Sequence, residues 1–270
     1  MTILIVLLGL LLSHYLALLG RWRNFDWLLW PVRQLENHPG PPAVRAVLVV
    51  VLLALACAWL LTALFYWLPG GLGRPLLALL VFVYTLGPRD LDRDVKRVLD
   101  EAEDFDGQAA ARMLGVADAN SPAAAGAAVM RTACTRWFAV VFWFVLLGIP
   151  GALLYRFCQQ AILRNRLSEA ELDWLRRLRW VLEWPVLLLM TLTLGLVTDL
   201  DRIAAVWKSY HRKYAWWAIS PRLLEYAAAA ALADADSIAG GVRRGHQLAW
   251  RMLVLWLAVM SLMLIAGWIN

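Results

Sequence analysis

The amino-acid sequence predicts an all-α, polytopic membrane protein with about six transmembrane helices and two cytoplasmic helical segments, in one membrane domain over residues 1–270. Three observations predict this fold class. The chain is 62% hydrophobic and only 17% charged, which is more apolar surface than one soluble core of 270 residues can bury. Its apolar residues form runs close to the ~20 residues that cross a bilayer, without the alternating segments typical of a membrane barrel. Finally, it holds 16 tryptophans, a residue that favours the membrane–water interface.

The apolar runs give six candidate spans. The run 44–68 is the clearest, and the short run 72–87 is expected to form a tight helical hairpin with it. The span 137–155 contains Pro150, which removes a backbone hydrogen bond and predicts a kink or an early exit. In chain order, the expected spans are approximately 2–20, 44–68, 72–87, 137–155, 181–198 and 250–268.

Two polar segments, 88–136 and 199–249, are expected to be helical and cytoplasmic. Within the first, Ser121 precedes a proline, a pattern that predicts an N-cap and the first residue of a helix. Ser168 with Glu171 three residues later is a capping-box pattern, so a further helix should begin there.

The distribution of basic residues orients the chain. With the N-terminus outside, 19 of the 26 basic residues face the cytoplasm, as the positive-inside rule requires. The segment 156–180 conflicts with this orientation, because its six arginines then lie outside. A re-entrant fold at 148–151 would bring those arginines inside but would move the basic residues of 199–251 outside.

Several classes of function are excluded by the motifs. No Gly-Lys dipeptide occurs, so the chain has no Walker A nucleotide site, and no Gly-x-Ser-x-Gly occurs either. The net charge of +6 indicates loops facing anionic lipid rather than nucleic acid, because no basic–aromatic recognition motif accompanies it. We expect no catalytic residue, cofactor or metal site, since no two histidines stand at metal-ligand spacing. The acids that follow residue 89 could bind Mg²⁺, but acids at a helix start also complement the helix dipole, which is the preferred interpretation.

Two places remain as candidate sites. His14 is an ionisable residue inside an apolar run, and its alternative role is a neutral histidine bonded to a neighbouring helix. Two membrane-proximal helices should present a charged cluster on the cytoplasmic side, where arginines can bind carboxylate or phosphate of a ligand or partner. A salt network that anchors the helices is the alternative. The cluster consists of Arg89, Asp90, Arg93, Asp94, Asp199 and Arg202.

Three stretches resemble a known family. They are LGPRDLDRDV (86–95), VVFWFVLLGIPGALLYR (140–156) and LAWRMLVLWLAVMSLMLIAGW (248–268). Together they resemble the AmpE family of bacterial inner-membrane proteins and, more distantly, the CobD/CbiB family of cobalamin biosynthesis. The order and spacing of these elements match along nearly the whole chain.

The resemblance implies two different functions. AmpE proteins are associated with β-lactamase induction, hence antibiotic resistance, as sensory or signalling partners of a cytoplasmic cell-wall amidase, whereas CobD/CbiB proteins amidate the corrin ring. The corrinoid enzymes carry acid and amide residues on both sides of the central stretch. Here those places are 131–137 and 158–163, and neither contains an acid. This departure favours AmpE.

We therefore expect a regulatory or sensory protein of the inner membrane, non-catalytic, with membrane lipid and a cytoplasmic amidase or other signalling protein as partners. A corrinoid amide synthase and an oligomeric small-molecule transporter are the alternatives. The transporter would have to oligomerise, because six spans are few and the two halves show no inverted repeat.

Overall fold

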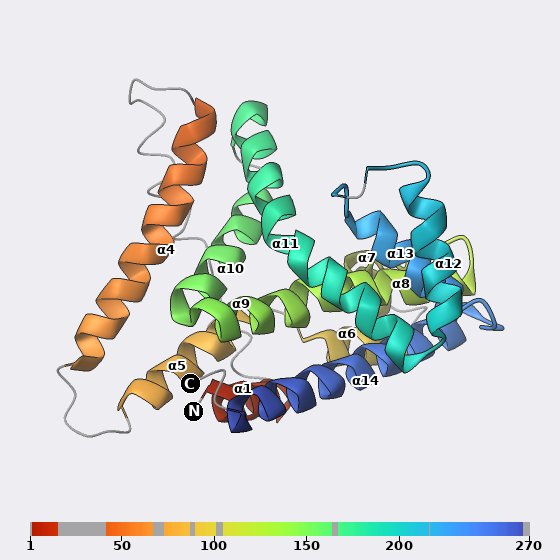
Figure 1. Cartoon of the computed structure of the whole chain (residues 1–270), viewed down its shortest axis with the longest axis horizontal. Coiled ribbons are helices and arrows are strands. Elements are labelled where there is room, and N and C mark those ends of the chain that lie inside the picture. Colours follow the sequence, from red (N-terminus) through yellow and green to blue (C-terminus); the bar gives the residue numbers. More distant parts are fainter. Residues whose placement is uncertain are drawn as a thin grey trace. The chain divides into compact units, whose positions relative to one another are not determined.

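The computed structural model describes residues 2–15, 42–66, 73–86, 90–100, 105–163, 167–215 and 217–266. Every regular element in these ranges is a helix (Figure 1), which confirms the predicted all-α class. Four helices in the described ranges are long and apolar enough to cross a membrane, and the shorter Pro75–Thr85 is also apolar. The number of six spans stays a prediction. The four long helices are Ala46–Ala63, Pro122–Leu147, Glu169–Val197 and Ile238–Met263.

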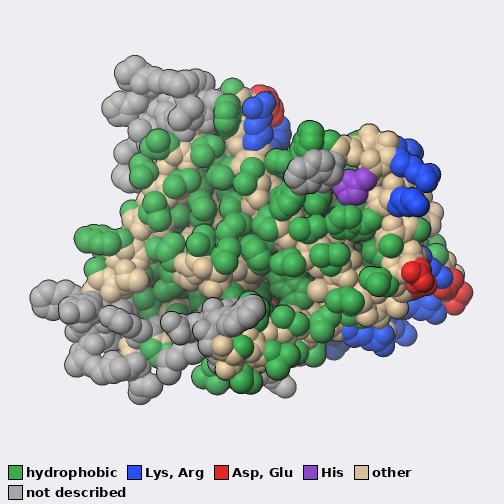
Figure 2. All heavy atoms as spheres, viewed as in Figure 1, with side chains coloured by type: hydrophobic (Ala, Val, Ile, Leu, Met, Phe, Trp, Pro, Cys, Tyr) green, Lys and Arg blue, Asp and Glu red, His purple; other side chains and the backbone are tan. Residues whose placement is uncertain are grey.

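Large apolar side chains are exposed on these helices. Hydrophobic side chains cover much of the face drawn in Figure 2. A soluble protein rarely exposes this many large apolar side chains on its helices, and lipid is the solvent that removes their cost. Examples are Leu52 and Trp59 in the first long helix, Leu192 and Leu196 in the third, and Val259 and Leu262 in the fourth.

The chain divides into two compact units. The first comprises Met1–Pro88 and Ala139–Leu182, and the second Arg89–Phe138 and Glu183–Asn270. Each is described separately below.

In the first unit, one helix is buried by its neighbours on all sides. This helix, α10 (Ile149–Leu163), packs against α4 (Pro42–Tyr66), α5 (Gly73–Thr85) and α9 (Ala139–Leu147). The contact of α4 with α5 agrees with the expected hairpin. The unit also contains α1 (Thr2–Tyr15), which packs against α5, and the first part of α11 (Glu169–Val197).

Gly148 breaks the helix where the proline motif predicted it. Its φ is +67°, a left-handed conformation that glycine adopts without steric cost. Helix α9 therefore ends at Leu147, and α10 begins at Ile149 with Pro150 in its first turn, where proline is tolerated. The span expected over 137–155 is thus divided, and the continuous apolar helix lies earlier, from Pro122 to Leu147.

A buried arginine lies in α10. Arg156 is only 2% exposed, its Nε donates to the carbonyl oxygen of Thr85, and Nη1 donates to Oε1 of Gln159. Thr85 is the last residue of α5, so the guanidinium lies at the negative end of that helix dipole. One of the six arginines of 156–180 is therefore part of the protein interior rather than of a loop.

The second unit contains the remaining helices. Ser121 caps α8 as predicted, because its Oγ accepts from the backbone N–H of Ala124 at 3.2 Å. The capping box at the start of α11 in the first unit is also confirmed, with the backbone N–H of Ser168 donating to Glu171 at 3.0 Å. The helices of the second unit are α6 (Leu91–Asp100), α7 (Phe105–Leu114), α8 (Pro122–Ala133), the π-helix η3 (Cys134–Phe138), α12 (Leu200–His211), α13 (Pro221–Ala231), α14 (Ile238–Ile265) and the later part of α11.

Helices α8 and α14 touch backbone to backbone. A Cβ at Gly241 would lie 1.9 Å from the carbonyl oxygen of Pro122, and one at Gly245 would lie 2.6 Å from that of Gly126. The contacts follow the same order along both helices, so the helices run parallel. Small residues four apart allow this approach, which is typical of packing between membrane helices.

Helix α8 continues without interruption through η3 into α9. The expected cytoplasmic segment 88–136 thus ends inside a continuous helix rather than at its boundary. Likewise, α14 begins at Ile238, twelve residues before the expected span at 250.

Candidate functional site

Two acids of α6, Asp92 and Asp94, contact other helices of the second unit. Asp90 precedes the helix, and its Oδ1 accepts from the backbone N–H of Asp92 at 3.3 Å, satisfying a free donor of the first turn. The helix is strongly amphipathic and buries Leu91, Val95 and, unusually, Asp94. A carboxylate buried with apolar residues requires a charged or hydrogen-bonding partner.

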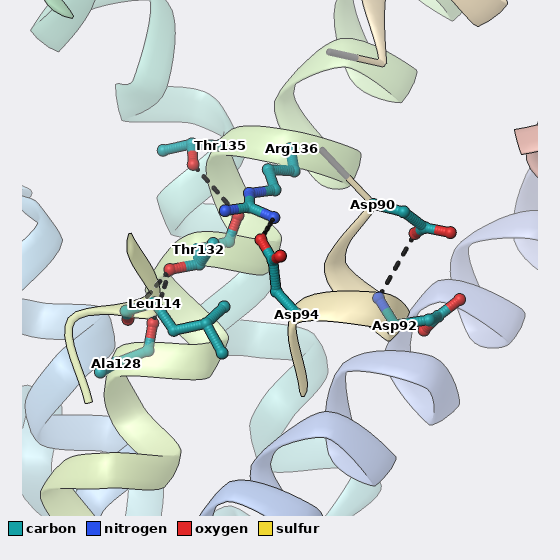
Figure 3. A network of polar contacts seen from close by, with 8 residues as sticks. All are labelled: Asp90, Asp92, Asp94, Leu114, Ala128, Thr132, Thr135 and Arg136. Carbon is teal, nitrogen blue, oxygen red and sulfur yellow. Dashed lines mark hydrogen bonds and ion pairs between the residues drawn. The ribbon is translucent and has the colours of Figure 1, made fainter. Parts of the chain in front are cut away.

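Arg136 supplies that partner. Its Nη1 lies 2.7 Å from Oδ2 of Asp94 (Figure 3). The Asp94 side chain is 2% exposed and the Arg136 side chain 14% exposed, so water screens the pair weakly. This is a short, charge-assisted hydrogen bond in an almost dry environment.

The π-helix η3 places Arg136. A π-helix adds one residue to a turn and is frequent at functional sites. Two threonine hydroxyls bond carbonyls around it (Figure 3): Thr132 Oγ1 donates to the carbonyl of Ala128 at 3.0 Å, and Thr135 Oγ1 donates to that of Thr132 at 3.0 Å. Thr132 also donates to the carbonyl of Leu114 at 3.2 Å, which joins this turn to the end of α7.

Asp92 is held by two side chains of α14. Its Oδ1 accepts from Nε1 of Trp250 at 2.9 Å and lies 2.6 Å from Nε2 of His246. These two residues are four apart, so they share one face of the helix. Trp137 of η3 completes the group, with its ring centroid 5.2 Å from that of Trp250 and 6.2 Å from that of His246.

We call Asp92, Asp94, Arg136, His246 and Trp250 the α6 network. It combines an aspartate–imidazole pair, 13% and 20% exposed, with a nearly buried ion pair. Within the described ranges, no three acids, histidines or cysteines are arranged to hold a metal ion. The network offers an ion pair and hydrogen-bonding groups for recognition of a ligand or partner.

The predicted charged cluster divides between two places. Asp94 and the half-buried Arg93 belong to α6, and Asp90 directly precedes that helix. Arg89 lies outside the described residues.

Asp199 and Arg202 lie at the start of α12. Asp199 is the N-cap, and its Oδ1 accepts from the backbone N–H groups of Asp201 and Arg202. Arg202 lies 3.6 Å from the carboxylate of Asp234 and donates to the carbonyl of Ala230 at 3.2 Å. These contacts join the start of α12 to the end of α13 and the residues that follow it. His14 belongs to α1, but its side chain lies outside the described residues.

Sequence reasoning missed Asp92, Arg136, Trp137, His246 and Trp250 as site residues. His246 and Trp250 carry a signal, because they stand four apart where α14 changes from polar to apolar. The π-turn that directs Arg136 has no comparable local signal.

Comparison with known proteins gives no family assignment: no family, no curated protein and no solved structure matches this chain.

Proposed function

We propose that the chain is a regulatory or sensory protein of the bacterial inner membrane, of the AmpE type, that acts in β-lactamase induction and cell-wall recycling signalling without catalysing a reaction. One observation carries the proposal. The bond from Trp250 Nε1 to Asp92 Oδ1 joins the stretch 86–95 to the stretch 248–268, and both belong to the phrases that resemble AmpE proteins. A site formed by both stretches would explain why the two phrases occur together in one chain.

The pairing of the two acids favours regulation over amide synthesis. A synthase that activates a carboxyl group with ATP needs carboxylates open to a metal ion. Here Asp94 faces the guanidinium of Arg136, and Asp92 faces the indole N–H of Trp250 and the imidazole Nε2 of His246. These contacts suit a network whose arrangement is altered by a ligand or a partner.

The position of the network in the chain fits a signal that passes between membrane and cytoplasm. Arg136 directly precedes the wholly apolar α9, and Trp250 begins the apolar part of α14. A cytoplasmic partner that competes for Asp92 would loosen α14 from α6. That change would alter the packing of two membrane-crossing helices at once.

The test uses a strain from which the gene for this chain has been deleted. The strain is complemented with the wild type, with Asp92→Asn, or with Asp100→Asn as the matched control, and β-lactamase activity is measured after addition of an inducing β-lactam. Asp100 is an exposed acid at the other end of the same helix. We expect Asp92→Asn to lose most of the wild-type effect on induction at equal membrane abundance, and Asp100→Asn to keep it.

Unchanged induction in the deletion strain would contradict the proposal. Restored cobalamin synthesis in a strain lacking the corrinoid synthase would support the amide-synthase alternative instead. Uptake of a solute by proteoliposomes that contain the purified chain would support the transporter.

A further inference from the structure

The first turns of α11 carry an unusual exposed surface in the first unit. Leu172 and Leu175 point inward and are buried. Between and after them, tryptophan and arginine side chains are exposed. We call this surface the Arg–Trp surface; it consists of Trp174, Arg176, Arg177 and Trp180.

A hollow lies on this surface. It has a volume of about 370 Å³ and is lined by Asp173, Arg176, Arg177 and Trp180. The hollow is shallow and open to solvent, and its lining offers guanidinium N–H groups beside an indole ring.

The two arginines are held differently. Arg176 lies 2.8 Å from the carboxylate of Asp173 and 3.4 Å from that of Glu169, so its charge is largely compensated. Arg177 lies over the ring of Trp174, 5.0 Å from its centroid. No carboxylate in the described part of the chain pairs with Arg177. The stacking fixes its guanidinium and leaves the N–H groups at its edge for an anion.

The place of the surface along α11 sets its depth relative to a bilayer. From Val181 to Val197 the helix has a single charged residue, Glu183, and that side chain is buried. This part of α11 is apolar enough to lie in hydrocarbon. The Arg–Trp surface immediately before it then lies at the height of the lipid headgroups, where tryptophan is favoured.

We propose that the Arg–Trp surface binds the headgroup of an anionic phospholipid, with the phosphate on Arg177 and the glycerol region against Trp180. Arginine binds a phosphate through paired N–H groups, and a basic side chain near an anionic membrane attracts its lipids. The inference does not depend on the proposed regulatory function.

The test measures lipid binding by the full chain in detergent, by native mass spectrometry with added phosphatidylglycerol. The variant is Arg177→Gln, and the matched control is Arg243→Gln, which removes an exposed arginine from α14. We expect about a fivefold loss of affinity for Arg177→Gln, as one basic residue contributes at a membrane surface. We expect no change for Arg243→Gln, and Arg177→Lys should keep more binding than Arg177→Gln because it keeps the charge.

Three results would overturn the proposal. The first is equal affinity of wild type and Arg177→Gln. The second is equal binding of phosphatidylcholine, which would mean that the negative headgroup is not recognised. The third is displacement of the lipid by millimolar inorganic phosphate or glycerol phosphate, which would assign the hollow to a soluble anion.

Discussion

The second unit contains two groups of aspartate and arginine side chains that look alike in the sequence and differ in the structure. In the α6 network, Asp94 and Arg136 are 2.7 Å apart and almost completely buried. At the start of α12, Arg202 lies 3.9 Å from Asp199 and 3.6 Å from Asp234, with all three side chains more than two-fifths exposed. The buried pair of Asp94 and Arg136 is held in one geometry. In the exposed group at α12, water can replace either partner of an ion pair.

In these two groups the burial of an ion pair, rather than its residue types, determines how strongly its geometry is fixed. A buried pair costs desolvation and is retained only where its geometry matters, while exposed pairs contribute little. The predictions below test this contrast, beginning with the largest expected effect on the free energy of unfolding.

Asp94→Ala should have the largest effect. It leaves the guanidinium of Arg136 buried without the carboxylate, and breaking a buried pair in this way costs about 3–5 kcal/mol. The measurement is the free energy of unfolding in mixed detergent micelles. The double variant Asp94→Leu with Arg136→Met should recover most of the loss, because no charge is then buried. A loss below ~1 kcal/mol for Asp94→Ala would show that the pair is as solvated as the one in α12.

Gly241→Ala should have the next largest effect. The added methyl group would lie 1.9 Å from the carbonyl oxygen of Pro122, so α8 and α14 must separate, at a cost of about 3 kcal/mol. Gly240→Ala is the control, because its Cβ would meet only Oγ of Ser237, at 3.0 Å, and alanine favours the helix. Equal melting temperatures of the two variants would refute the close approach of these helices.

Trp250→Phe should cost about 2 kcal/mol. The substitution keeps an aromatic ring beside Trp137 but removes the N–H that donates to the carboxylate of Asp92, and hydrogen bonds to charged groups contribute about 1.5–3 kcal/mol. Trp256→Phe is the control, since its Nε1 bonds the neutral hydroxyl of Thr193 at 3.3 Å. An equal loss for Trp256→Phe would show that a hydrogen bond to the Asp92 carboxylate stabilises the chain no more than one to a neutral hydroxyl.

Asp234→Asn should have the smallest effect, below about 1 kcal/mol. The Asp234 carboxylate is largely exposed, and its 3.6 Å contact with Arg202 is screened by water and salt. Any loss should disappear in 1 M salt, whereas the loss from Asp94→Ala should persist. A large, salt-insensitive loss for Asp234→Asn would remove the contrast between the two groups.

Local sequence signals predicted the parts of the fold that depend on a few neighbouring residues. Ser121 before a proline, Ser168 with Glu171, and the Gly148–Pro150 break all appear where expected. In each case one side chain or one φ angle determines the backbone, so the sequence alone suffices.

Other parts depend on contacts between distant segments and could not be predicted. The alanine-rich α8 is only moderately apolar, so hydropathy placed the start of the predicted span at 137, although the helix begins at Pro122. Of the two acids in the α6 network, Asp94 was predicted as a site residue and Asp92 was not. Their partners Arg136 and His246 are 42 and 154 residues away in sequence. The packing of α14 and α8 against α6 brings these partners to it.

The most direct test of the α6 network as the functional centre is a double-variant cycle on β-lactamase induction, with Asp92→Asn, Trp250→Phe and both together at matched membrane abundance. If the two residues act through the bond between them, each single variant reduces induction and the double variant is no worse than the stronger single one. Losses that multiply in the double variant, or single variants that both induce normally, would contradict a shared site.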